Sequence, residues 1–312
     1  MIISELKPGM SVQDIYLCKS KQILTNKNGK SYISLVLSDK TGTINAKIWE
    51  PNSSDINDFS KSSFVYIEGN VTEYNNDPQL IINLISIADE NCYNEADYFP
   101  VTPYDIDNLY QYIIEFIDDI DNPDLANLLR SFFENEKFVT VFKKSSAAKK
   151  VHQAYVGGLL EHTVNVAIIC NSFASMYSNV NKDLLITCAL LHDIGKVKEF
   201  SPFPENDYTD EGNLLGHIYI GTQLITEHAK KLNIPKSLLV QIQHCILAHH
   251  GELEYGSPKK PAILEALILH IADDADANIT RFNTLIKELP EDNIWSEKSD
   301  FILNTKVRKT II

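Results

Sequence analysis

Residues 190–200 read Leu-Leu-His-Asp-Ile-Gly-Lys-Val-Lys-Glu-Phe, and this stretch decides how the second part of the chain is interpreted. It continues the apolar run Leu-Leu-Ile-Thr-Cys-Ala-Leu-Leu at 184–191, which indicates a buried helix. His192 and Asp193 stand at the end of that helix, just before Gly195, a residue type that commonly ends helices. Because consecutive helical residues point about 100° apart, the two side chains can reach different sides of one ion, or the carboxylate can bridge two.

Other histidines and one further acid occur in the same setting, on or beside apolar helical stripes. The side chains that share it are His162, His192, Asp193, His217, His249, His250 and Asp273. Burying imidazoles and carboxylates without partners is costly, and several that converge are best satisfied by metal ions. Imidazole together with carboxylate suits manganese, iron, cobalt, nickel or zinc rather than calcium. The second part of the chain therefore predicts a metal centre.

The chain changes character near residue 95, because apolar residues alternate with polar ones only before that point. In the clearest example, Ile33, Leu35 and Leu37 alternate with their neighbours, as in a half-buried strand. The predicted strands are 12–18, 31–38, 43–49, 64–72 and 79–87. Five short strands in so small a segment predict a closed barrel, since closure removes exposed edges.

From residue 96 onward, apolar residues recur at helical spacing. Thr102-Pro103 and Asn122-Pro123 are predicted helix starts, with proline at the first helical position. Further helices are predicted near 157–175, 182–194, 216–232, 236–249 and 260–280. The chain is thus expected to be multidomain, with an all-β barrel over 1–95 followed by an all-α domain over 96–312.

The order of these residues resembles a known superfamily. The chain resembles the HD phosphohydrolases in the order of His162, His192-Asp193 and Asp273. The remaining histidines of the set make it resemble the two-metal branch of that superfamily. The resemblance implies that His162, His192, Asp193 and Asp273 bind one divalent ion, while His217, His249 and His250 bind a second, with Asp193 bridging. Manganese is expected, with cobalt, iron, nickel or zinc as alternatives. Paired ions of this kind activate water and offset charge on a phosphodiester.

The last acid of the set has close neighbours. Asp273, Asp274 and Asp276 all follow His270, and Asp273 is preferred because it keeps the H-x-x-D spacing of the resemblance. Asp276, about one turn later, is expected to support a ligand or the substrate.

A closer resemblance covers roughly residues 5–280. Residues 7–50 and five segments of the second part resemble the YhaM-type 3′-to-5′ exoribonucleases. The five segments are KKVHQAYVGGLLEHTV, LLHDIGKVKEF, EGNLLGHI, LAHHGELEYGSPKKP and EALILHIADDADA. That family joins an N-terminal OB-fold to a C-terminal HD domain. The resemblance implies an enzyme that hydrolyses single-stranded RNA to nucleoside monophosphates, with single-stranded DNA as a second substrate or ligand to be tested.

The overall charge does not suit a protein that coats nucleic acid, because the net charge is −14. Local basic segments are nevertheless present, and residues 19–47 hold six lysines against one acid. Within this segment, Lys30, Tyr32 and Lys47 are the candidate substrate contacts, since phosphates need local positive charge and bases stack on aromatic rings. Trp49 is expected to fill the barrel core rather than to contact a base.

A second group of candidate substrate contacts belongs to the helical part. Lys149, Lys150 and His152 precede the helix of His162, and Lys259 lies in the loop after 255–258. The alternative is that such a charge run is only a solvated face. Lys196 is assigned as catalytic with Asp193, as a cation on the phosphate or a proton donor to the leaving oxygen. A lysine that offsets a helix dipole is the competing interpretation for this residue.

Two other functions fit part of the pattern. An HD-type phosphohydrolase of free or cyclic nucleotides would use the same metal centre, but it needs no strand-holding barrel. A non-catalytic binding protein is disfavoured because every expected ligand position is filled. The N-terminus lacks the apolar run of a signal peptide, and no apolar segment is long enough for a bilayer span. A cytoplasmic protein without membrane contact is expected, and a homo-oligomer is left open.

Overall fold

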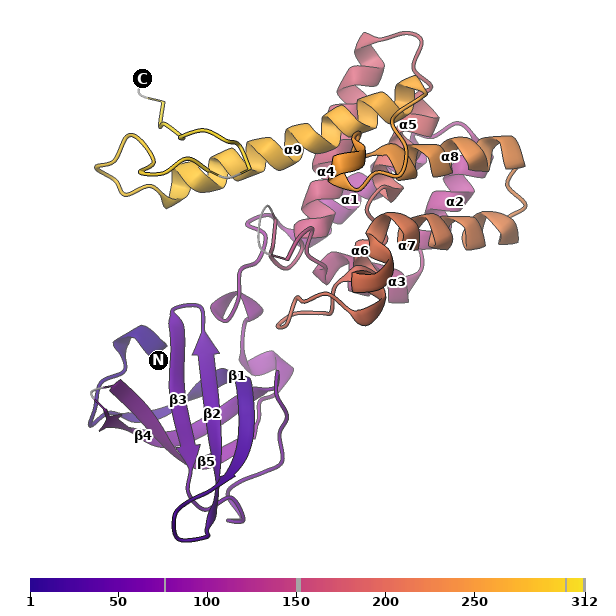
Figure 1. Cartoon of the computed structure of the whole chain (residues 1–312). Helices are drawn as coiled ribbons and strands as arrows, with labels where there is room; N and C mark the ends of the chain where they lie inside the picture. The colour runs from indigo at the N-terminus through magenta and orange to yellow at the C-terminus, as the bar shows by residue number, and fades with distance from the viewer. Residues whose placement is uncertain (76, 150–152, 301, 311–312) are drawn as a thin grey trace. The chain divides into compact units, whose positions relative to one another are not determined.

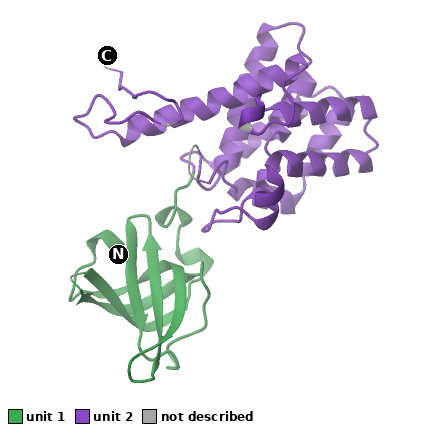
Figure 2. Cartoon of the chain, in the orientation of Figure 1, with its two compact units in different colours: residues 1–101 green, residues 102–312 purple. Residues whose placement is uncertain are grey.

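The computed structural model describes residues 1–75, 77–149, 153–300 and 302–310. The chain divides into two compact units, residues 1–101 and residues 102–312 (Figures 1 and 2). The boundary expected from the sequence, at residue 95, falls shortly before this division, at the start of the short 3₁₀ helix Glu95–Asp97. The first unit is all β apart from short 3₁₀ turns, and the second is mainly helical.

The first unit is a closed five-stranded barrel, as expected of an OB-fold. Its strands are β1 (Ser11–Thr25), β2 (Ser31–Asp39), β3 (Gly42–Ile48), β4 (Phe64–Tyr74) and β5 (Asp77–Ile87). They follow one another around the barrel in the order β1-β2-β3-β5-β4, and β3 pairs with β5 in parallel. The core is formed by the alternating side chains that the sequence indicated, among them Ile33, Leu35 and Leu37.

Strand β1 is longer than the sequence predicted. Beyond residue 18 it continues to Thr25 and pairs with β2 after a register shift between Cys18 and Ser20. Ile23 and Leu24 in this extension are exposed, so it contributes little to the barrel core. An apolar alternation could not mark its end for that reason.

The second unit contains nine α-helices among the described residues. They are α1 (Ile106–Asp118), α2 (Pro123–Phe133), α3 (Glu136–Lys144), α4 (Gly158–Met176), α5 (Lys182–Leu191), α6 (Lys196–Glu199), α7 (Asp210–Lys231), α8 (Lys236–Ala248) and α9 (Leu264–Glu288). Helices α4, α8 and α9 all pack against α5, whose residues from Leu184 onward are buried. The core therefore surrounds α5, the helix that ends just before His192.

Some predicted helix limits are confirmed and others are wrong. Asn122 caps α2 by accepting hydrogen bonds from two backbone N–H groups, and Pro123 is the first helical residue. The predicted start at Thr102-Pro103 is wrong, because Asp105 caps α1 instead and Thr102 bonds to α4, its Oγ1 donating to Glu161 at 2.5 Å.

Helix α7 begins at Asp210 and has a non-helical kink at Gly216, where the sequence had placed its start. Helix α9 extends to Glu288 rather than ending near 280, and its last buried residue is Asp276. Its final turns carry Phe282, Leu285 and Ile286 at helical spacing, and these side chains are only half-buried. No helix in the described part of the chain has both the length and the apolar content to cross a bilayer.

Candidate metal centre and nucleic-acid surface

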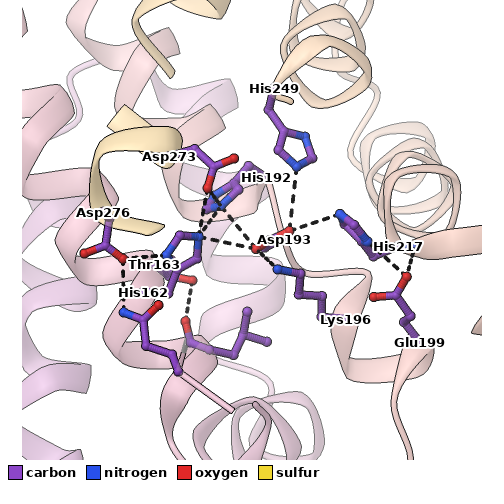
Figure 3. A network of polar contacts seen from close by, with 12 residues as sticks. His162, Thr163, His192, Asp193, Lys196, Glu199, His217, His249, Asp273 and Asp276 are labelled. Atoms are coloured by element: carbon purple, nitrogen blue, oxygen red, sulfur yellow. Dashed lines mark hydrogen bonds and ion pairs between the residues drawn. The ribbon is translucent and has the colours of Figure 1, made fainter. Parts of the chain in front are cut away.

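The polar side chains of the candidate centre come from five helices and meet in the interior of the helical unit (Figure 3). His162 lies on α4, His217 on α7 and Asp273 on α9, while His192-Asp193 and His249-His250 directly follow α5 and α8. The backbone at Gly195 explains how α7 comes so close. A Cβ atom at that position would lie 2.0 Å from the carbonyl oxygen of His217, so only glycine permits this approach.

Asp193 lies at the middle of the centre and is 2% exposed. Its Oδ2 atom is 3.3 Å from Nε2 of His192 and 3.5 Å from Nε2 of His162. Its Oδ1 atom is 3.4 Å from Nε2 of His217 and 3.7 Å from Nε2 of His249. The two oxygens of one carboxylate thus face two separate groups of imidazoles, which is the arrangement that a bridging ligand requires.

Two of the imidazoles are oriented by backbone carbonyl groups. Nδ1 of His192 donates to the carbonyl of Ala189 at 2.8 Å, and Nδ1 of His249 donates to that of Ile246 at 2.7 Å. A carbonyl oxygen can only accept, so the proton of each neutral ring must sit on Nδ1. Their Nε2 atoms therefore present lone pairs to the centre, as a metal ligand must.

The other two imidazoles are oriented by buried carboxylates. Nδ1 of His162 lies 2.7 Å from Oδ2 of Asp276, and Nδ1 of His217 lies 3.0 Å from Oε1 of Glu199 (Figure 3). Each carboxylate holds its ring through the nitrogen that faces away from Asp193. Such carboxylate–histidine pairs are the usual support of a histidine that binds a metal.

Three buried atoms at the centre have no hydrogen-bond partner among the described residues. They are Oδ1 of Asp193, Nε2 of His217 and Nε2 of His249. All three are acceptors in the tautomers just described, so they repel one another, and each unsatisfied buried atom costs about 1–3 kcal/mol. A divalent cation removes this cost, and the donor set of imidazole and carboxylate fits such an ion.

The structure contains two groups of side chains with the spacing to hold an ion. One group is His162, His192 and Asp193, and the other is His217, His249 and His250. Asp273 joins the first group, since its Oδ1 atom is 3.1 Å from Nε2 of His162. Asp276 instead contacts the opposite nitrogen of that ring, and Asp274 is exposed. The three neighbouring acids are thus in different positions, with Asp273 alone facing the centre.

Electrostatics at the centre favour bound positive charge. Burial would lower the pKa of His162, but hydrogen bonds to Asp273 and Asp276 raise it to about 10. Burial likewise opposes the charge on Asp193, yet Lys196 and His192 hold its pKa well below the ordinary value. The carboxylates therefore favour positive charge at this place, which a bound cation would also supply.

Lys196 is part of this centre. It begins α6, is 8% exposed, and places Nζ 2.6 Å from Oδ2 of Asp193. Although burial opposes its charge, Asp193 raises its pKa. The ammonium group pairs with a buried carboxylate rather than with the carbonyl groups at the end of α5, so the helix-dipole interpretation does not describe it.

The barrel carries an exposed cluster of aromatic and basic side chains. The rings of Tyr32 and Trp49 lie with centroids 5.0 Å apart, and Nζ of Lys47 is 5.2, 5.1 and 5.2 Å from the rings of Tyr32, Trp49 and Tyr74. The expectation that Trp49 fills the barrel core is wrong, because its side chain is 43% exposed. Ile48, the last residue of β3, is buried in the barrel, and Trp49 directly after it points outward.

The remaining candidate contacts have other partners, are exposed in loops or lie outside the described residues. Lys30 is in the turn between β1 and β2, where its N–H donates to Asn26. Lys149 forms an ion pair with Asp207, and Lys259 is exposed in the loop before α9. Lys150 and His152 lie outside the described residues.

Sequence reasoning missed several residues of these sites. Glu199 is the last acid of the stretch quoted above, and its place six residues after Asp193 was an available signal. Trp49 could have been placed from the alternation of Ile44, Ala46 and Ile48. Gln153 and Asn165, which both bond to Asp276, carry no signal in the sequence.

Two protein families match the two units. The HD domain family matches residues 159–278, and the family described as OB-fold nucleic acid binding domain matches residues 18–88. Proteins named 3′-5′ exoribonuclease YhaM are similar over nearly the whole chain. The one from Bacillus subtilis (strain 168) is 33% identical over 90% of this chain and 89% of its own length. The one from Halalkalibacterium halodurans is 35% identical over 90% and 88%. With both domains matched in the same order, the chain belongs to the YhaM family of 3′-5′ exoribonucleases.

Proposed function

We propose that this chain is a metal-dependent 3′-to-5′ exoribonuclease that hydrolyses single-stranded RNA to nucleoside monophosphates. The observation that carries the proposal is the buried carboxylate of Asp193, which faces four imidazole Nε2 atoms. The relatives named above are exoribonucleases by their printed names.

Two divalent ions would share the centre. His162, His192, Asp193 and Asp273 would hold one, and His217, His249 and His250 the other, with Asp193 common to both. Manganese suits these nitrogen and oxygen donors, and cobalt, iron, nickel or zinc would also fit. When bound, such ions lower the pKa of a water molecule and offset negative charge on a phosphodiester.

The protein side chains supply orientation and a mobile proton. Asp276 and Glu199 fix the rings of His162 and His217, so their Nε2 atoms stay directed inward. Lys196 pairs with Asp193. If bound cations neutralised that carboxylate, the ammonium group would be free to contact a phosphate oxygen or to protonate the leaving 3′ oxygen.

The barrel would hold the strand upstream of the cleaved end. Tyr32, Trp49 and Tyr74 offer faces on which successive bases can stack, and Lys47 offers charge to a phosphate. Stacking of this kind does not read the 2′-hydroxyl, so we expect single-stranded DNA to bind as well. The five free cysteines suit a reducing compartment, and we place the enzyme in the cytoplasm.

A time course on 3′- and 5′-labelled RNA, repeated with Mn²⁺, Co²⁺, Mg²⁺, Zn²⁺ and chelator, tests this function. We expect immediate release of labelled mononucleotide from the 3′-labelled strand and gradual shortening of the 5′-labelled strand. An intact RNA beside rapid hydrolysis of free or cyclic nucleotides would favour the other HD-type activity. An intact RNA that is bound tightly, with no nucleotide hydrolysis, would favour a binding protein.

A further inference from the structure

The carboxylate of Asp276 is held by two amide side chains that come from different parts of the helical unit. Its Oδ2 atom accepts from Nδ1 of His162 at 2.7 Å and from Nε2 of Gln153 at 3.0 Å. Its Oδ1 atom accepts from Nδ2 of Asn165 at 2.9 Å. Asn165 lies on α4 beside His162, whereas Gln153 lies in the segment before that helix. The orientation of His162 therefore depends on residues on both sides of the start of α4.

Gln153 has a strained backbone conformation and a buried side chain. Its φ angle is +49°, in the left-handed region that residues other than glycine rarely adopt. The residue is 1% exposed, and its Oε1 atom has no partner among the described residues. Backbone strain lowers stability, and strained positions cluster at functional sites.

The backbone of Gln153 connects it to a basic segment. Its carbonyl oxygen accepts from the N–H of Ala147 at 3.1 Å. Lys149 follows two residues later, forms an ion pair with Asp207 and lies over the ring of Tyr208. Gln153 thus bonds through its side chain to the support of His162 and through its backbone to the segment that carries Lys149.

We propose that Gln153 is a positioning residue that fixes Asp276, and through it His162, and that couples the metal centre to the segment Ala147–Lys149. The proposal rests on the proposed function, because that function assigns His162 to a metal ion, and it adds Lys149 as a contact for RNA. Asn165 supplies the matched comparison, since it donates to the same carboxylate without contacting that segment in any described hydrogen bond.

The test uses the full chain with Gln153→Ala and Asn165→Ala. Isothermal titration of the metal-free proteins with Mn²⁺ gives the affinity, and RNA hydrolysis at saturating Mn²⁺ gives kcat and KM. We expect both variants to bind the tighter Mn²⁺ at least about tenfold more weakly, the usual effect of losing such a support. Only Gln153→Ala should also raise KM for RNA, by about threefold or more, because without the amide the strained backbone can relax and release the carbonyl group that holds Ala147.

Gln153→Gly guards against a folding defect, because glycine accepts the positive φ angle while removing the amide. Circular dichroism confirms that it folds. Wild-type Mn²⁺ affinity in a folded Gln153→Gly variant would overturn the proposal, and so would an equal rise of KM in the Gln153 and Asn165 variants. If the wild-type protein binds Mn²⁺ but leaves RNA intact, the proposed exoribonuclease activity is rejected. The role of Gln153 is still tested in that case, because the Mn²⁺ titration compares the variants without RNA.

Discussion

The barrel surface and the metal centre carry their polar groups in opposite ways. Lys47 is surrounded by Tyr32, Trp49 and Tyr74, and the residues of this cluster are exposed or half-buried. Asp193 and His249, by contrast, are almost completely buried among other polar groups. A solvated cluster loses affinity in small steps when one member is removed. A buried centre loses its function when one of its side chains is removed, because the remaining groups have no alternative partner.

The largest effect is expected when the central carboxylate is removed. Asp193→Ala should lower the rate of RNA cleavage by about three orders of magnitude or more, since several kcal/mol of charge stabilisation disappear. RNA affinity, measured by fluorescence anisotropy, should stay within about threefold of wild type, because exposed contacts on the barrel dominate it. Asp193→Asn, which keeps the shape beside Lys196, should lose the same activity. Cleavage at the wild-type rate in either variant would remove the centre from the mechanism.

The three neighbouring acids of α9 allow the comparison to be made within one helix. We expect Asp273→Ala to abolish binding of one Mn²⁺, and Asp276→Ala to weaken Mn²⁺ binding by about 10–100-fold, as for a residue that supports a ligand. Asp274→Ala is the control and should change neither affinity nor rate, since its side chain is exposed. Equal effects of all three substitutions, measured by Mn²⁺ titration, would contradict the geometry.

A smaller effect is expected at the barrel. Trp49→Ala should weaken RNA binding by about tenfold, within the range of about 1–3 kcal/mol for a base stacked on an aromatic ring. Hydrolysis of a trinucleotide should be unaffected, because so short a fragment does not depend on the barrel. Trp295 is the other tryptophan of the chain, and it is also exposed. Trp295→Ala should leave RNA affinity unchanged, and a loss equal to that of Trp49→Ala would argue against a specific surface.

The smallest effect concerns salt. Lys47→Ala should reduce the slope of log affinity against log salt concentration by about 0.7, the value for one phosphate contact on a single strand. Lys61→Ala, elsewhere on the barrel, serves as the control in the same anisotropy titration. An unchanged slope for Lys47→Ala would mean that this ammonium group does not contact the strand.

The two units also differ in which sequence pattern predicted their structure. The convergence of the candidate ligands was predictable because histidines and acids stood out inside apolar helices, where they cannot be left without partners. The barrel was predictable from alternation, yet Trp49 was placed on the wrong side because its size suggested a core residue. Ile48 already fixed the inward direction, so position should have outweighed size.

The supporting residues could be predicted less well. Gln153 reaches Asp276 across 123 positions of sequence, through a backbone conformation that no apolar pattern encodes. Glu199 reaches both the N–H and the Nδ1 of His217 just after the kink at Gly216. These contacts depend on tertiary packing, whereas the inward-facing ligands follow from helix periodicity.

The close approach at Gly195 has a consequence for engineering. The distance between the two halves of the centre is fixed where one backbone touches another, with no side chain between them. Transplanting the histidines and acids onto a different helical scaffold would therefore not recreate the site. The recipient would also need a bare α-carbon at this crossing, because one added methyl group would push His217 out of reach of Asp193.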